Sequence, residues 1–294
     1  MIAQIRPFAV LLSCAAAPAQ AHGGATIGFE APTLWLYLLL IIAAASYARG
    51  LHTLWRAAGR GRGVVRREAA AFFAGSLLLA VLVSDAVEDV TTSSFAAHMV
   101  QHELLMLVVA PLLVVGRPLA TWTWALPVSA RARVARVFAH PAWRVPWSAL
   151  TSPLGATAAQ LSLLVVWHLP WAFDRAVSHP WLHALQHTCF LVPAIAFWWS
   201  VIGARGRHRV GAVMAALFIT MTATGALGAL LTFAPRPWYA AALPPAEALL
   251  DQQLGGLVMW VPGGVVYLLA AVWSMAGWLG KDPKRLHAAG APKR

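Results

Sequence analysis

Residues 95–115 have the sequence FAAHMVQHELLMLVVAPLLVV, which is apolar over most of its length and has Glu103 as its one residue of the types Asp, Glu, Lys and Arg. A helix needs about 20 mainly apolar residues to cross a bilayer, so this run predicts a membrane-spanning helix. In the whole chain of 294 residues, 60% are hydrophobic and 11% are charged, whereas a soluble domain has roughly 25% charged residues. The sequence therefore predicts an all-α, polytopic transmembrane helix bundle.

Six other apolar runs accompany this stretch, and together they predict seven spans. We expect the spans at residues 33–48, 69–87, 95–115, 153–173, 181–202, 210–234 and 252–278. Residues 1–21 are typical of a secretory signal peptide, with a small-residue cleavage motif at Ala19-Gln20-Ala21. A lipid-modified Cys14 is the alternative. We expect a seven-span membrane domain at residues 22–280 and a basic cytoplasmic tail at residues 281–294.

The basic residues orient this bundle. With the N-terminus outside, 19 of the 22 Lys and Arg residues fall in inner segments, Arg175 and Arg236 fall in outer ones, and Arg6 lies in the signal peptide. Cytoplasmic loops carry an excess of Lys and Arg, so we expect the N-terminus outside and the C-terminus inside. The net charge of +12 then indicates an inner surface that contacts anionic lipid, not nucleic acid.

Two similar histidine motifs stand at the outer ends of the third and fifth spans. His98-Met99-Val100-Gln101-His102 and His183-Ala184-Leu185-Gln186-His187 both have the pattern H-x-x-Q-H. Residues four apart lie on one face of a helix with Cβ atoms about 5–6 Å apart, so each pair can present two imidazoles to one metal ion. The repetition indicates an internal duplication that brings both pairs to the same depth. We therefore expect one shared, half-exposed metal site.

Other side chains near these motifs are weaker candidate ligands. His168 precedes Pro170, and it is either a further ligand or an interfacial histidine bonded to the backbone that the proline leaves free. Met99 and Met106 are candidate thioether ligands, with core packing as the alternative. Imidazole suits both zinc and copper, and Cu(I) also binds thioether sulfur. The sulfur atoms therefore favour copper.

Acidic and amide side chains accompany the histidines. An ionisable residue inside a span costs several kcal/mol unless it has a partner, and the second ring nitrogen of a metal-bound histidine often bonds a carboxylate. On this basis the expected hydrogen-bond partners of the ligands are Glu103, Gln101, Gln186, Asp251 and Gln252. The acids of the preceding outer turn are equally well explained as helix-capping residues in a wet vestibule. These acids are Asp85, Glu88 and Asp89.

Four ordered blocks together resemble a known family. They are His98 to Pro118, Trp167 to Asp174, His183 to Trp199 and Asp251 to Gly264. The chain resembles the integral-membrane CtaG family over about residues 69–278, and that family is associated with assembly of caa(3)-type cytochrome c oxidase. The residues that match the family's pattern are His98, His102, His168, His183, His187, Asp251, Gln252 and Gln253. Glu103 departs from it, because an apolar residue, often Met, is expected there.

The resemblance implies a multi-span assembly factor at the outer face of the bacterial inner membrane. Its implied cargo is copper, and its implied partners are cytochrome c oxidase subunits or a periplasmic copper chaperone. From the residues, a haem b cytochrome with bis-histidine ligation, a copper transporter and a metal-free scaffold remain alternatives. We expect no enzyme, because the chain lacks a convincing serine nucleophile motif and its H-x-x-x-H pairs lack the glutamate of zinc proteases.

Overall fold

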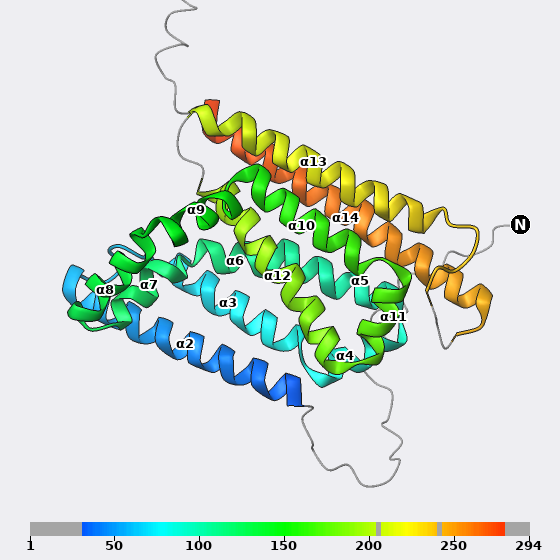
Figure 1. Ribbon diagram of the computed structural model, residues 1–294, viewed down its shortest axis with the longest axis horizontal. Coiled ribbons are helices and arrows are strands. Elements are labelled where there is room, and N and C mark those ends of the chain that lie inside the picture. Colours follow the sequence, from blue (N-terminus) through cyan, green and yellow to red (C-terminus); the bar gives the residue numbers. More distant parts are fainter. Residues whose placement is uncertain (1–30, 204–206, 240–242, 280–294) are drawn as a thin grey trace, which may run out of the picture.

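The computed structural model describes residues 31–203, 207–239 and 243–279, and this part of the chain is helical without any strand (Figure 1). The elements are α2 (Ala31–Ala58), α3 (Arg66–Leu82), α4 (Asp85–Ser93), α5 (Phe95–Leu104), the π-helical turn η2 (Leu105–Val109), α6 (Ala110–Val115), α7 (Pro118–Ala125), α8 (Val128–Ala139), α9 (Pro141–Leu150), α10 (Pro153–Trp167), α11 (Pro170–Ser178), α12 (Pro180–Ile202), α13 (Arg207–Thr232) and α14 (Pro245–Leu279). The expected signal peptide at residues 1–21 and the tail at residues 281–294 lie outside the described residues.

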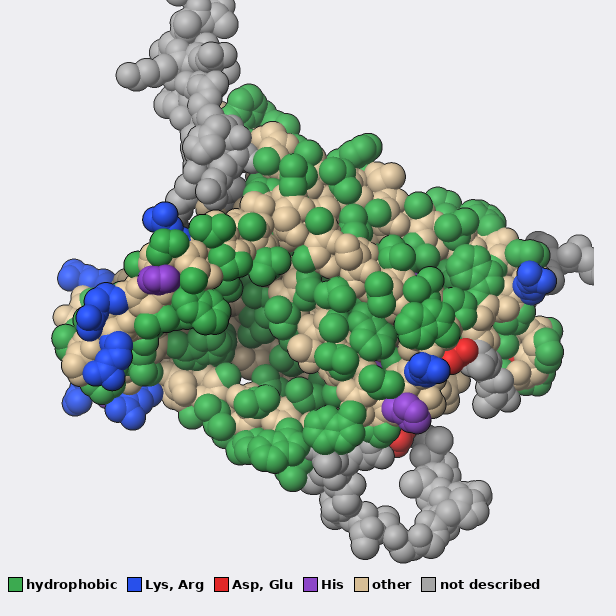
Figure 2. Space-filling model, viewed as in Figure 1, with side chains coloured by type: hydrophobic (Ala, Val, Ile, Leu, Met, Phe, Trp, Pro, Cys, Tyr) green, Lys and Arg blue, Asp and Glu red, His purple; other side chains and the backbone are tan. Residues whose placement is uncertain are grey.

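The described helices confirm a transmembrane bundle. Five are long and apolar enough to cross a bilayer, and the number rises to seven if each of two bent helix pairs counts as one span. The bent pairs are α3 with α4, at 57°, and α9 with α10, at 72°. Apolar side chains cover much of the molecular surface (Figure 2), as a bilayer requires.

Two expected spans are shorter than the sequence indicates. The second was expected to reach residue 87, but its helix ends at Leu82, and α4 starts from Ser84 at a new angle. The fourth was expected to reach residue 173, but α10 ends at Trp167, and α11 begins at Pro170. Pro170 explains the second break, because proline lacks a backbone N–H and disfavours helical geometry in the preceding residue. No proline lies at the first break. The breaks leave α4 and α11 as short helices beside the N-terminal ends of α5 and α12 (Figure 1).

Close helix contacts hold the C-terminal half of the chain together. A Cβ atom added to Gly256 of α14 would lie 2.5 Å from the carbonyl oxygen of Gly228 in α13, so the two backbones touch. Small residues permit such an approach between helices in membranes. Nearby, Trp198 of α12 donates its indole N–H to the carbonyl oxygen of Met106, 2.8 Å away. The Trp198 ring belongs to a buried cluster with Phe190, Phe197 and Tyr267.

The two ends of the bundle differ in charge. Lys and Arg side chains gather at the end that carries α8 and the connection between α2 and α3 (Figures 1 and 2). Residues 117–152 form most of this end as three short helices, and α8 and α9 contain no buried residue. The helices α4 and α11 and the start of α5 lie at the other end, where the histidine motifs are found.

Candidate metal centre

The structure brings the two H-x-x-Q-H motifs together. Neighbouring turns of α5 and of α12 each present two imidazoles toward the other helix, as the spacing of four residues requires. The ring centroids are 4.3 Å apart for His98 and His102, 4.3 Å for His183 and His187, 5.0 Å for His98 and His183, and 5.3 Å for His102 and His187. We refer to these four side chains as the histidine cluster.

The histidine cluster is buried, which corrects the expectation of a half-exposed site. The exposed fractions of the four residues are between 0% and 5%, because α4 and α11 lie beside the N-terminal ends of α5 and α12. Among the described residues, neither ring nitrogen of His98 or His102 has a hydrogen-bond partner, and neither does Nε2 of His183. A buried polar atom without a partner costs about 1–3 kcal/mol.

A metal ion would give these nitrogens a partner. His98, His102 and His183 each offer one nitrogen, and the three nitrogens lie within 4.8 Å of one another. Imidazole nitrogens bind zinc and copper about 2 Å from the ion, so small side-chain movements suffice to close the three around one ion. The donor set and its burial therefore fit a metal centre.

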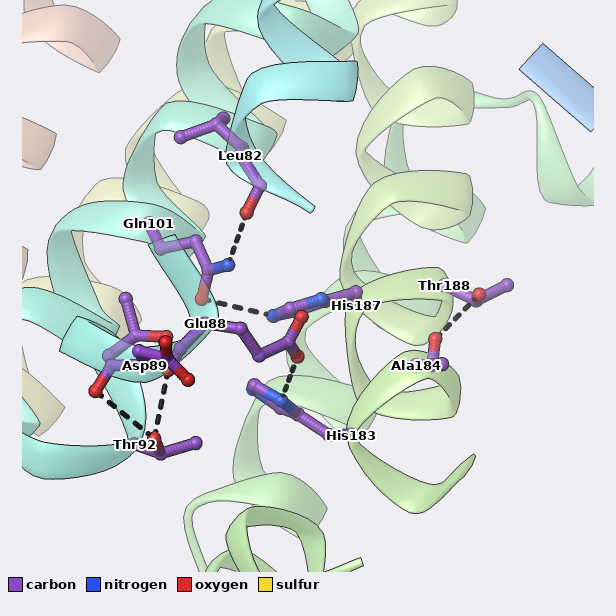
Figure 3. A network of polar contacts seen from close by, with 10 residues as sticks. Leu82, Glu88, Asp89, Thr92, Gln101, His183, Ala184, His187 and Thr188 are labelled. Atoms are coloured by element: carbon purple, nitrogen blue, oxygen red, sulfur yellow. Dashed lines mark hydrogen bonds and ion pairs between the residues drawn. The ribbon is translucent and has the colours of Figure 1, made fainter. Parts of the chain in front are cut away.

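Gln101 orients one of the four imidazoles. Its amide Nε2 donates to the carbonyl oxygen of Leu82 at 2.6 Å, so its Oε1 is left to accept from Nε2 of His187 at 3.1 Å (Figure 3). This pattern assigns the proton of His187 to Nε2 and leaves its Nδ1 with a free electron pair. The expected contact between Gln101 and a site histidine is thus formed. Gln186 is fully buried beside His187, and neither of its amide atoms has a partner within the described chain.

Glu88 is a site residue for which the sequence left two roles equally open, helix capping and hydrogen bonding to a histidine. It projects from α4, and its Oε1 contacts Nδ1 of His183 (Figure 3). This contact leaves Nε2 of His183 to face the cluster, which is the carboxylate–histidine arrangement that commonly supports metal ligands. Glu88, His183 and His187 form a second group whose potential ligand atoms lie within 4.8 Å. Only the helix break before α4, which the sequence did not reveal, brings Glu88 to this position.

Asp251 has a different role from the expected one. Its carboxylate accepts from the backbone N–H of Phe95 at 2.6 Å, from that of Ala96 at 3.2 Å and from the hydroxyl of Ser94 at 2.8 Å. It therefore caps the N-terminus of α5, whose first turns carry His98, and does not bond an imidazole. The neighbouring Gln252 accepts from the backbone N–H of Trp238 at 2.6 Å. Asp251 thus fixes the start of α5, and Gln252 fixes the loop at Trp238, so neither residue bonds a metal ligand directly.

Glu103 also points away from the imidazoles. A Cβ atom on Gly263 would lie 3.0 Å from Glu103 Oε2, which is buried and has no hydrogen-bond partner among the described residues. The expected thioether ligands are likewise occupied elsewhere. The sulfur of Met106 is 3.9 Å from the amide nitrogen of Gln160, and Met99 packs in an apolar cluster with Met259.

His168 lies at the edge of the histidine cluster. Its Nδ1 is 2.8 Å from the carbonyl oxygen of Leu164, so it bonds the backbone as one alternative predicted, but at Leu164 and not at the carbonyl that Pro170 leaves free. Its Nε2 is buried without a partner in the described structure. Tyr239 donates its hydroxyl to the carbonyl oxygen of His168 at 3.0 Å. Burial, with a smaller contribution from the Asp174 carboxylate, raises the pKa of Tyr239 and keeps this donor protonated.

We expect Asp251→Ala to destabilise the protein by roughly 2–4 kcal/mol, because it removes a charged acceptor shared by three donors. The melting temperature of the purified protein in detergent measures this effect. Glu247→Ala is the matched control, since Glu247 is an exposed acid in the first turn of the same helix. Equal melting temperatures for the two variants would contradict the capping role.

Most of the chain is similar to known protein sequences. The profile described as cytochrome c oxidase caa3 assembly factor (Caa3_CtaG) matches residues 45–281, which include every helix of the site. An uncharacterised protein of Mycobacterium leprae is 26% identical over an alignment 293 positions long, and the alignment covers 87% of this chain and 42% of that protein. The chain thus spans less than half the length of this curated relative. No solved structure matches the chain.

Proposed function

We propose a function from the premise that this chain belongs to the Caa3_CtaG family, the cytochrome c oxidase caa3 assembly factors. The family and the apolar helices together describe a multi-pass membrane protein that acts in oxidase assembly. Beyond this, we propose that the histidine cluster binds copper transiently as cargo and passes it toward the oxidase. The observation that carries the proposal is the group of five buried imidazole nitrogens without partners, on His98, His102 and His183.

The donor set supports copper as the cargo. Imidazole nitrogen is a good ligand for copper as well as for zinc, and the resemblance to oxidase assembly factors favours copper. In both His183 and His187 the hydrogen bond holds the proton on one ring nitrogen. The other nitrogen, Nε2 of His183 and Nδ1 of His187, therefore has a free electron pair. Copper binding at these atoms therefore requires no proton to leave the site.

Haem binding is less well supported by the geometry. An axial imidazole points a ring nitrogen at the haem iron, so two axial ligands face each other through nitrogen atoms across the macrocycle. The rings of His98 and His183 instead lie nearly parallel, at an interplanar angle of 21° and a centroid distance of 5.0 Å. Stacked rings leave no gap for a macrocycle between them, whereas a single ion can bind at their edges.

Polar side chains that could bind an ion in transport extend through only part of the bundle. Below the histidine cluster, polar groups continue through Glu103, Gln160 and Tyr267. They then meet the buried aromatic rings of Phe197 and Trp198, which offer no ligand to an ion. This order favours a cargo that enters and leaves at the same end of the bundle.

We further propose that the site faces the periplasm. The Lys and Arg side chains gather at the opposite end (Figure 2), and basic loops stay in the cytoplasm. The protein then lies in the bacterial inner membrane with its N-terminus outside and its C-terminus inside. A periplasmic copper chaperone or an outer-facing oxidase subunit would meet the site at this surface.

A His102→Ala plus His187→Ala variant tests the proposed function in cells. In a strain that lacks the native protein, we expect this variant to leave the oxidase with the copper content and activity of the uncomplemented strain, because each helix loses one ligand. His179→Ala is the control, since His179 is an exposed histidine at the start of α12. Normal oxidase copper content in the double variant would rule out the proposed role of the cluster.

A further inference from the structure

The histidine cluster contains two overlapping groups of potential ligands that share one residue. The inner group is His98, His102 and His183, and the outer group is Glu88, His183 and His187. The ligand atoms of each group lie within 4.8 Å of one another. His183 therefore stands between two positions that an ion could occupy.

The two positions differ in their access to the surface. The side chain of Glu88 is 28% exposed, whereas that of its partner His183 is 2% exposed. His98 and His102, which complete the inner group, are 0% and 2% exposed. An ion that approaches from outside can thus meet Glu88 before it meets the inner nitrogens.

The charges near Glu88 favour the approach of a cation. Asp85 and Asp89 lie on the same short helix, α4, which contains no basic residue. A site lined by charges of one sign raises the local concentration of the opposite ion. An acidic surface alone would not indicate a metal site. Here Glu88 contacts His183, whose Nε2 is a buried imidazole nitrogen without a partner among the described residues.

The hydrogen bonds define which atoms are free in each position. Glu88 contacts Nδ1 of His183 through one carboxylate oxygen, so its other oxygen remains for an ion (Figure 3). His187 donates its Nε2 proton to Gln101, which leaves Nδ1 as its donor atom. Nε2 of His183 is the atom without a partner, and it serves the inner group.

We propose that Glu88 and His187 form a loading position from which Cu(I) moves to the inner group of His98, His102 and His183, an inference that rests on the proposed copper-binding function. In this step the bonds from copper to the Glu88 oxygen and to Nδ1 of His187 break. Bonds to the nitrogens of His98 and His102 and to Nε2 of His183 form. Copper remains Cu(I), and the Nδ1 proton of His183 stays in its bond with Glu88, so no electron or proton is transferred.

Stopped-flow loading of the full-length, metal-free protein in detergent tests this proposal. The bicinchoninate complex of Cu(I) supplies the metal, and its loss of absorbance follows the transfer. We expect Glu88→Gln to slow loading by roughly tenfold or more, because the charged ligand that attracts the ion is lost. Glutamine can still accept the Nδ1 proton of His183, so the final copper content should match that of the unmodified protein.

Asp89→Asn is the matched control, since Asp89 is an exposed neighbour with the same charge, and the described residues show an ion pair with His183 at Glu88 and none at Asp89. This variant should load much faster than Glu88→Gln, because it removes one attracting charge but no ligand. His102→Ala should take up Cu(I) as fast as the unmodified protein, because the loading position is intact. Excess chelator should then remove copper from this variant more readily than from the unmodified protein. Glu88→Asp, which keeps the charge, should restore most of the rate.

Three results would overturn the proposal. If Glu88→Gln loads as fast as the unmodified protein, Glu88 does not form a loading position. If both Glu88→Gln and Glu88→Asp, each eluting as a monodisperse species in gel filtration, lose their final copper content, Glu88 is a permanent ligand. If the unmodified protein takes up no Cu(I), the proposed copper-binding function fails and the loading position fails with it.

Discussion

A His98→Ala plus His183→Ala variant is expected to lose Cu(I) binding, with an affinity at least 100-fold below that of the unmodified protein. The reason is that each substitution removes a nitrogen from the inner group, and the two come from different helices. Loss of a residue that merely supports a metal ligand already lowers affinity by 10–100-fold. Competition with a chelator of known affinity, together with the copper content of the purified protein, measures the effect.

The control for this variant removes two imidazoles elsewhere. His52→Ala plus His179→Ala leaves the cluster intact, because both residues are exposed and lie outside it. This control should bind copper as the unmodified protein does. Equal losses in both double variants would show that copper binds surface histidines nonspecifically, and equal retention would show that the cluster is not the site.

Gly256→Val is expected to have the largest effect on the fold. The new Cβ would lie 2.5 Å from the carbonyl oxygen of Gly228 and 2.7 Å from the backbone nitrogen of Thr232. Overpacking a core costs about 1–3 kcal/mol when side chains can adjust, and here the contacted atoms include backbone. We therefore expect α13 and α14 to separate, with a loss of more than about 3 kcal/mol and little monodisperse protein in detergent.

Gly264→Val provides the comparison on the same helix. No described atom lies within 4 Å of a Cβ atom at Gly264, so the larger side chain meets open space. Its yield and melting temperature should stay close to those of the unmodified protein. If Gly256→Val proves equally stable, the contact between α13 and α14 does not hold this half of the bundle together.

Local sequence patterns were sufficient to predict the helices and the main ligands. The apolar run of residues 95–115 coincides with the helical segment Phe95–Val115. The spacing of His98 from His102 needs only the geometry of a single helix, and its repetition at His183 indicated a shared site. Each helix and each histidine pair could thus be predicted from residues within a single span.

The remaining features depend on packing between distant segments. Glu88 reaches His183 because α3 ends at Leu82 and α4 turns by 57°, a break that no proline marks. Asp251 caps α5 from a position more than 150 residues away in the sequence. The acidic residues were recognised, but their partners could not be assigned without the arrangement of the helices.

The π-helical turn η2 follows directly after the turn that carries His102. Such a turn accommodates one residue more than an α-helical turn, and one residue of α-helix corresponds to a rotation of about 100°. If the same number of residues formed a regular α-helix, His98 and His102 would therefore be rotated by about 100° away from α12 while Gly116 stayed against Phe72. The number of residues in this segment, and not only their apolar character, sets the rotational phase of the ligands.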